Sequence, residues 1–151
     1  MNTYSAWLAK ALLGLVGLGV AGLGHAACTL DAPTVILPPY NALGTAPAPV
    51  NVSFVVSCTT NAVVQIQASA GNSGNQLSRQ LRKGSAPIAY NLYVGSTATT
   101  VWGNGAANTG VASGRVVANG TSQIVGNLRV PGGQNPEPGV YTDVLMFTMI
   151  Y

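Results

Sequence analysis

Few side chains in this chain of 151 residues could carry out chemistry. It has one histidine, His25, and three acidic residues, Asp31, Glu137 and Asp143. Nucleophilic catalysis of the Ser-His-Asp or Cys-His kind needs a histidine base, and a zinc site needs three or four suitable ligands. Because His25 lies in an N-terminal segment typical of an export signal, both arrangements are excluded. We therefore predict that the protein is not an enzyme and needs no metal or cofactor.

Two weaker chemical signals remain. Glu137 and Asp143 flank one loop rich in Pro and Gly, and paired carboxylates can hydrolyse glycosidic bonds. However, Asp143 follows a Gly-x-Tyr-Thr turn into a strand, where an aspartate more often accepts backbone hydrogen bonds. The sequence GNSG at residues 71–74 weakly resembles a phosphate-binding loop, but no Lys-Thr pair or helix follows it. We interpret that segment as a β-turn.

The two cysteines, Cys28 and Cys58, are best explained as one disulfide in an exported chain. Metal ligation would lack further ligands, and a catalytic thiol would lack a histidine base. Closing a loop of about 30 residues stabilises a fold by roughly 3–4 kcal/mol on the chain-entropy model.

The N-terminal segment, residues 1–26, is typical of a secretory signal peptide. Lys10 supplies a positive charge, and residues 11–23 form an apolar run that is too short for a relaxed membrane span. Gly24 and Ala26 are small residues at the −3 and −1 positions of a cleavage site. We predict cleavage after Ala26.

The N-terminal segment has two other interpretations. An N-terminal membrane anchor formed by the apolar run is the main alternative to cleavage. A lipoprotein attached through Cys28 is disfavoured, because His25 stands where a lipobox needs Leu or a similar residue. Residues 27–151 remain as the predicted mature part, long enough for one domain with its own core.

Charged residues are scarce, at 6% of the chain, with a formal net charge of +3. A typical domain is about a quarter charged, so this surface is polar but nearly neutral, or is covered by a partner. Arg79, Arg82 and Lys83 form the one basic cluster. No aromatic residues interleave with it, as base stacking would need, and we interpret it as a solvated loop. We predict neither a nucleic-acid partner nor a small-molecule substrate.

Short strands separated by turn signals indicate an all-β sandwich or barrel. Val50–Cys58 is the clearest strand, because its alternation places Cys58 on the same inward face as Phe54. Asn119-Gly120 is a hairpin signal. The strands are predicted at residues 29–37, 50–58, 62–70, 88–94, 111–118, 123–130 and 139–151, with short strand ends around Val101-Trp102.

The last of these segments, residues 139–151, is the most apolar stretch outside the signal. Side chains alternate with period two in a strand, so its residues divide between two faces. One face holds Leu145, Phe147, Met149 and Tyr151, and the other holds Val144, Met146, Thr148 and Ile150. A strand that is apolar on both faces is expected to be covered on both sides.

Motifs along most of residues 27–151 resemble those of the spore coat U domain family, which includes pilins of the archaic chaperone–usher pathway. The matching segments are Cys28 before the first strand, VVSC at 55–58, RQL at 79–81, IAYNLY at 88–93, WGNG at 102–105, RVPGGQ at 129–134 and GVYTD at 139–143.

The resemblance implies an incomplete immunoglobulin-like β-sandwich that lacks its last strand. A periplasmic chaperone lends a strand, and a neighbouring pilus subunit replaces it as an outer-membrane usher exports the chain to the cell surface. On this resemblance, the strand-accepting groove and chaperone interface would be bordered by Leu145, Phe147, Met149 and Tyr151.

A pilin that donates a strand needs an extension of ten or more residues before its first cysteine. Predicted cleavage after Ala26 leaves only Ala27 before Cys28. We therefore expect a subunit that accepts a strand without giving one, as a tip or minor subunit would.

Two other functions stay open at this point. An apolar terminal strand ending on Tyr151 is also typical of a small outer-membrane β-barrel, and a self-sufficient secreted binding domain would share the same composition. The aromatic residues Tyr40, Tyr93 and Trp102 could contact a partner, although packing in the core or in loops is the favoured interpretation.

Overall fold

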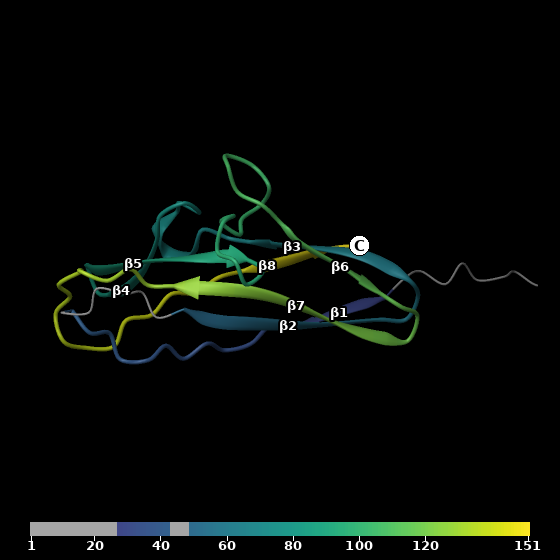
Figure 1. The fold of residues 1–151 in the computed structure, drawn as a ribbon, viewed down its shortest axis with the longest axis horizontal. Coiled ribbons are helices and arrows are strands. Elements are labelled where there is room, and N and C mark those ends of the chain that lie inside the picture. The colour runs from purple at the N-terminus through teal and green to yellow at the C-terminus, as the bar shows by residue number, and fades with distance from the viewer. Residues whose placement is uncertain (1–26, 43–48) are drawn as a thin grey trace, which may run out of the picture.

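The computed structural model describes residues 27–42 and 49–151, so the predicted signal peptide and residues 43–48 lie outside the described part. Two β-sheets pack face to face as a sandwich (Figure 1). In the described part, no helix is long and apolar enough to cross a membrane. The elements are β1 Cys28–Asp31, β2 Val50–Cys58, β3 Ala62–Ala68, the 3-10 turn η1 Gly71–Ser73, β4 Arg79–Lys83, β5 Ala86–Val94, β6 Ala112–Val116, β7 Gly120–Arg129 and β8 Phe147–Ile150.

The first sheet has the order β1-β2-β7-β5-β4 and the second has the order β6-β3-β8, with antiparallel pairing throughout. Asn119 does turn the chain, with φ 54°, and the Gly120 amide donates to the Val117 carbonyl at 2.9 Å. The predicted hairpin is nevertheless wrong, because β6 pairs with β3 while β7 pairs with β2. The turn carries the chain from one sheet to the other.

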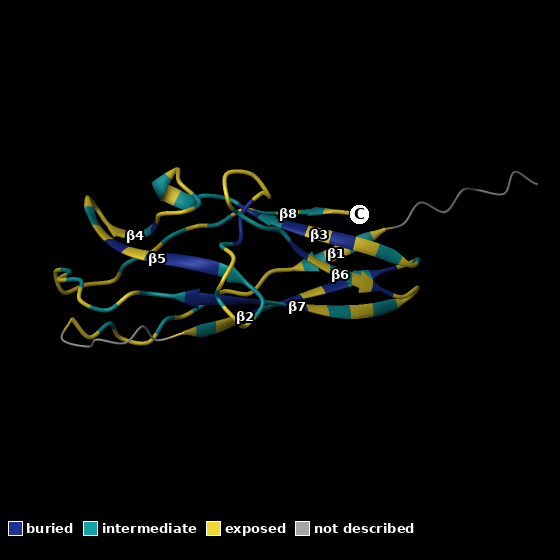
Figure 2. Cartoon of the chain, turned by 45° about the horizontal axis from the view of Figure 1, so that its top comes forward, coloured by how far each residue is buried: buried dark blue, intermediate teal, exposed yellow. Residues whose placement is uncertain are grey.

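The core lies between the sheets, and Figure 2 shows its buried segments on β3, β5 and β7. Along β2 the predicted alternation is confirmed, because Val52, Phe54, Val56 and Cys58 are buried. Apolar side chains of β2 therefore face the second sheet.

Trp102 fills the centre of the core. It is fully buried and its indole NH donates to the Ile66 carbonyl at 2.7 Å. Its ring centroid lies 5.1 Å from that of Phe54 and 5.8 Å from that of Phe147. A Cβ on Gly126 would lie 2.6 Å from the indole, so glycine at that position leaves room for the ring. The core interpretation of Trp102 is confirmed.

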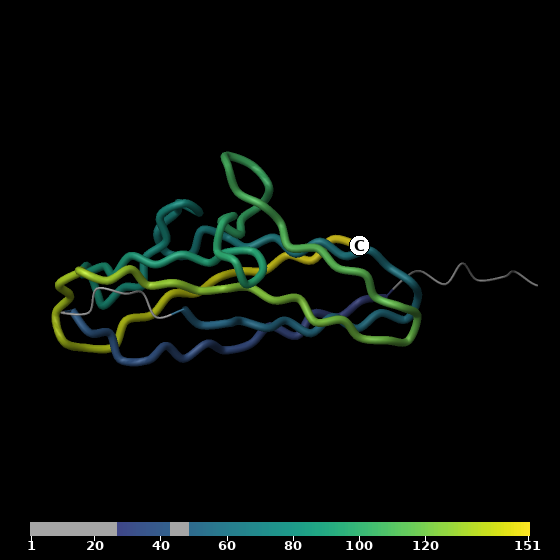
Figure 3. The backbone as a smooth tube through the Cα atoms, viewed as in Figure 1, coloured from purple at the N-terminus to yellow at the C-terminus, as the bar shows by residue number. Residues whose placement is uncertain are grey.

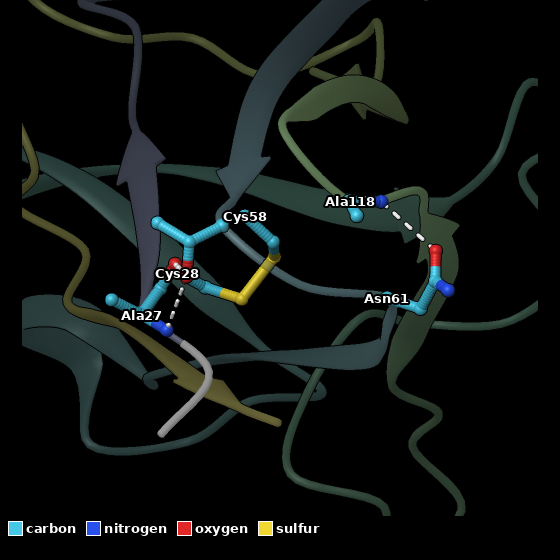
Figure 4. The surroundings of a disulfide bond; sticks show 6 residues. Ala27, Cys28, Cys58, Asn61 and Ala118 are labelled. Carbon is cyan, nitrogen blue, oxygen red and sulfur yellow. Dashed lines mark hydrogen bonds between the residues drawn. A yellow bond between two sulfur atoms is a disulfide. The ribbon is translucent and has the colours of Figure 1, made fainter. Parts of the chain in front are cut away.

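The disulfide joins Cys28 to Cys58, which are direct partners in the register of β1 and β2 (Figure 4). Beside it, the Thr59 amide donates to the Ala27 carbonyl at 3.0 Å. The start of β1 is therefore fastened to β2 both covalently and by hydrogen bonds.

Three predicted boundaries are corrected by the structure. The first strand ends at Asp31, where Pro33 follows closely and has no amide to donate to a sheet. The connection predicted between residues 71 and 85 contains η1 and β4. The terminal strand predicted at 139–151 is a strand only over Phe147–Ile150.

The disulfide yields a stability prediction. Replacing both Cys28 and Cys58 by serine should lower the free energy of unfolding by roughly 3–4 kcal/mol, because the unfolded chain loses a closed loop of about 30 residues. Urea unfolding of the purified domain measures this difference. A reductant should destabilise the wild type and leave the double variant unchanged, whereas equal stability of the two proteins would contradict the prediction.

Candidate functional site: an open groove beside β8

Strand β8 is the edge of the second sheet. It pairs with β3 over four residues, from Ala68 opposite Phe147 to Gln65 opposite Ile150. Along its other side, no strand of the described part pairs with it. Its backbone donors and acceptors on that side are thus available to another strand.

A cavity, called the inner cavity from here on, opens beside this edge, between residues 33–37 and residues 143–147. Figure 3 traces the two segments as the blue tube that continues from β1 and the yellow tube that leads to the C-terminus. The cavity has a volume of about 310 Å³. Its floor is made by side chains of the core, which are Val52, Phe54, Tyr90, Leu92 and Leu128.

A second cavity of about 980 Å³ continues from the first, between residues 34–42 and 136–143. Both are lined by Leu37, Leu81 and Asp143. Together they form one elongated, largely apolar depression, called the groove from here on. No Lys or Arg side chain lines it in the described part.

The four residues predicted to border the groove differ in how far they are buried. Leu145, Phe147 and Met149 are half-buried and pack against the core, and the first two line the inner cavity. Tyr151 is 55% exposed. The opposite face is not covered as expected, because Val144 is 77% exposed within the described chain.

The rim of the groove over residues 142–146 passes from one sheet to the other. Thr142 exchanges two backbone hydrogen bonds with Arg82 in β4, at 2.9 and 3.0 Å. Met146 then accepts from the Ser69 amide at 2.9 Å, and its own amide donates to the Ser69 hydroxyl at 2.9 Å. This crossing explains why the apolar run does not form one long strand.

Asp143 stands at the middle of the crossing. It accepts hydrogen bonds from the Tyr90 hydroxyl at 2.6 Å and from the amides of Asn72 and Val144, both at 2.8 Å. A Cβ on Gly71 would overlap the carboxylate, so the backbone approaches Asp143 there as only glycine permits. The prediction that Asp143 accepts backbone hydrogen bonds is confirmed, and the 71–74 segment forms a 3-10 turn instead of the predicted β-turn.

Arg79 overturns part of the basic-cluster prediction, because it is fully buried. Its guanidinium donates to the carbonyls of Ser69, Gln76 and Trp102, at 2.6, 3.2 and 2.7 Å, and to the Asn91 side chain at 2.8 Å. These acceptors satisfy a charge that burial would otherwise penalise. Burial lowers the pKa of Arg79, while Tyr90 and Asp143 act in the opposite direction.

The rest of the cluster is exposed, as predicted. Lys83 donates to the Pro138 carbonyl at 2.7 Å and lies 3.8 Å from the Glu137 carboxylate. Glu137 and Asp143 therefore have separate partners, an exposed lysine for one and a buried tyrosine for the other. The described residues contain no cluster of three or more His, Cys, Asp or Glu suited to a metal ion.

Burial raises the pKa of Tyr90, and the hydrogen bond to Asp143 acts in the same direction. The phenol therefore stays protonated and remains a donor to Asp143 at neutral pH. The Asp143–Tyr90 pair provides a fixed polar contact at the floor of an otherwise apolar groove.

An open β-sandwich with an unpaired edge strand beside an apolar groove is typical of proteins that bind an extended segment of another chain. The chain belongs to the Spore Coat Protein U domain family, whose sequence model matches residues 17–148. Membership in this family makes it a structural, non-enzymatic protein, as the sequence predicted.

The fold is also similar to a solved chain from the CsuC–CsuE chaperone–tip adhesion subunit pre-assembly complex of the archaic chaperone–usher Csu pili of Acinetobacter baumannii. The TM-score is 0.61 at 17% identity, over 84% of this chain. The match spans 40% of the length of the solved chain. No curated protein was found to match the sequence.

The buried guanidinium yields a second prediction. Arg79→Lys should lower the free energy of unfolding by about 2–4 kcal/mol, because an ammonium group has fewer donors and cannot reproduce the fork of bonds to four segments. Arg82→Lys, at an exposed position of the same strand, is the matched control and should change it by at most about 0.5 kcal/mol. Urea unfolding measures both, and equal effects would contradict the buried role of Arg79.

Tyr90 yields a third prediction, on alkaline stability. Above about pH 10 an unfolded tyrosine loses its proton while folded Tyr90 keeps it, so the folded state binds more protons and stability falls as pH rises. Between about pH 9 and pH 11 the wild type should lose about 1.4 kcal/mol in total more than Tyr90→Phe. Urea unfolding between about pH 9 and pH 11 tests this, and parallel profiles for the two proteins would refute it.

Proposed function

We propose that this protein is a structural subunit of a surface pilus or coat, assembled by chaperone–usher donor-strand complementation. It would be exported to the periplasm, receive a strand from a periplasmic chaperone, and exchange it at the outer-membrane usher for a strand of a neighbouring subunit. Membership in the Spore Coat Protein U domain family supports this proposal. So does a fold similar to that of a chain in a chaperone–tip subunit complex.

The observation that carries the proposal is the groove itself. Core side chains of β2, β5 and β7, among them Phe54, Leu92 and Leu128, form the floor of a cavity that is open to solvent. Beside it, β8 has a free edge. An extended segment inserted here would pair with β8 through its backbone and place alternate side chains in the cavity, against its floor.

The energetic scale of this insertion is large. Burying four or five apolar side chains of the inserted segment, at about 1.5–3 kcal/mol each, would contribute roughly 6–15 kcal/mol. The stability of a whole domain is about 5–15 kcal/mol. The chain is therefore expected to be marginally stable alone and strongly stabilised by a donated strand.

Leu145, Phe147, Met149 and Tyr151 are proposed as the side of the groove that meets the chaperone and later the neighbouring subunit. Leu145 and Phe147 line the inner cavity, which supports their direct contact with the donated strand. Met149 and Tyr151 lie further along β8 and towards the C-terminus, where the same strand would continue.

The position of the subunit within the assembly rests on the predicted processing site. Cleavage after Ala26 would leave Ala27 as the residue before Cys28. Ala27 is hydrogen-bonded to Thr59, next to the disulfide, and so is not free to reach another subunit. We propose a strand-accepting tip or minor subunit, and mass spectrometry of the mature N-terminus tests this point.

The fourth prediction concerns the chaperone. Periplasmic expression together with the chaperone encoded beside its gene should give a soluble one-to-one complex, because the donated strand covers the groove. Without the chaperone, soluble yield should fall, and part of the chain should be degraded or aggregated. Soluble yield and co-purification measure both results, and a stable monomer without the chaperone would instead indicate a self-sufficient secreted domain.

A pair of variants locates the contact. Leu145→Asp should weaken the complex by at least about tenfold, because the carboxylate would be buried without a partner. Met146→Asp is the matched control, since its side chain is 72% exposed on the opposite face and lines neither cavity. Equal effects of the two variants on co-purification would exclude the groove as the contact surface.

A further inference from the structure

The inner cavity is bordered by side chains that point towards it but do not fill it. Leu145 and Phe147 are half-buried and line the cavity, directly above the core residues of its floor. Apolar side chains beside an unfilled apolar space gain by moving into it. The rim that carries them must therefore be kept in place by other contacts.

Those contacts are polar and come from three separate segments. Thr142 is paired with Arg82 in β4, Met146 is bonded to Ser69, and between them Asp143 is bonded to Tyr90 and to the turn η1. Among these anchors, Asp143 is the one that both lines the groove and reaches its floor. Its bond to the phenol joins the rim to β5, the neighbour of β4 in the first sheet.

The surroundings of Asp143 leave it little freedom. One carboxylate oxygen accepts from the amides of Asn72 and Val144, and the other accepts from the hydroxyl of Tyr90, which is 5% exposed. The carboxylate also lies where a Cβ on Gly71 would be. The bonds from the Asn72 amide and the Tyr90 hydroxyl can both be kept only while Asp143 holds its position relative to η1 and β5. A movement of the rim would break at least one of them unless η1 moved with it.

We propose that Asp143 is a positioning residue that sets the width of the groove: bonded to Tyr90 and to the turn η1, it fixes residues 142–146 relative to β5 until a strand is inserted. This inference rests on the proposed strand-accepting function and concerns the state of the groove before the strand arrives. Once inserted, the strand itself separates the rim from the core, and the contribution of Asp143 ceases.

The test separates the rate of insertion from the stability of the product. The probe is a synthetic peptide of alternating Val and Thr residues, mixed with the purified domain in a stopped-flow instrument. Binding is followed by the fluorescence of Trp102, whose ring lies 5.8 Å from that of Phe147 on β8. Tyr90→Phe and Asp143→Asn each remove the link, and Asp31→Asn, at an exposed position of β1 that lines neither cavity, is the control.

Both variants should slow association by about tenfold, which corresponds to the loss of one hydrogen bond to a charged group. Dissociation should stay within about twofold of the wild type, because the inserted strand then holds the rim. The double variant should be no slower than the slower single variant, since both remove the same link. Asp31→Asn should bind like the wild type.

A merely structural role predicts a different pattern. If the variants accelerate dissociation and leave association unchanged, or if Asp31→Asn slows association equally, the positioning role is wrong. Urea unfolding of each variant beforehand ensures that folded proteins are compared, and Tyr90→Phe keeps the shape of the side chain.

The outcome for the wild type distinguishes this inference from the function on which it rests. If the wild-type domain binds neither this peptide nor the chaperone, the strand-accepting function fails, and the positioning role fails with it. If the wild type binds and both variants associate at its rate, the function stands and only the role of Asp143 is refuted.

Discussion

The buried guanidinium of Arg79 is the interaction on which the open side of this sandwich depends. It joins the end of β3 at Ser69, the loop at Gln76, the side chain of Asn91 in β5 and the carbonyl of Trp102. The charge is tolerated because almost every donor finds an acceptor. Arg79 donates to the Ser69 carbonyl, and Ser69 is in turn hydrogen-bonded to Met146 in the rim. The buried guanidinium therefore helps to position residues 142–146 through Ser69.

Elements with strict alternation could be predicted from the sequence. In β2, apolar residues at every second position did face the core, and the same alternation placed β5. The disulfide followed from the presence of two cysteines in a chain predicted to be exported. These features depend on local periodicity or on simple chemistry, which single-sequence reasoning captures.

Other features depended on long-range packing and were missed. Nothing local to Arg79 signals that it is buried, because its acceptors come from residues up to 23 positions away. The Asn119-Gly120 turn has the composition of a hairpin, yet the strands on either side pair with different neighbours. The apolar run at the end of the chain is broken as a strand because Asp143 anchors it between two sheets. The family resemblance predicted the β8 side of the groove. It did not predict the hydrogen bond between Asp143 and Tyr90 at the floor of the groove.

The disulfide gives the two sides of the groove different mechanical properties. A pulling force applied between the two ends of the domain would enter at Cys28 and pass through the disulfide to Cys58. The chain between these cysteines would therefore carry none of the force. Residues 33–37, on one side of the groove, belong to this protected part. The other side, residues 143–147 and β8, lies in series with that path and is joined to its neighbours by noncovalent contacts, mainly hydrogen bonds. Under load, one side is protected covalently, and resistance to rupture depends on the other.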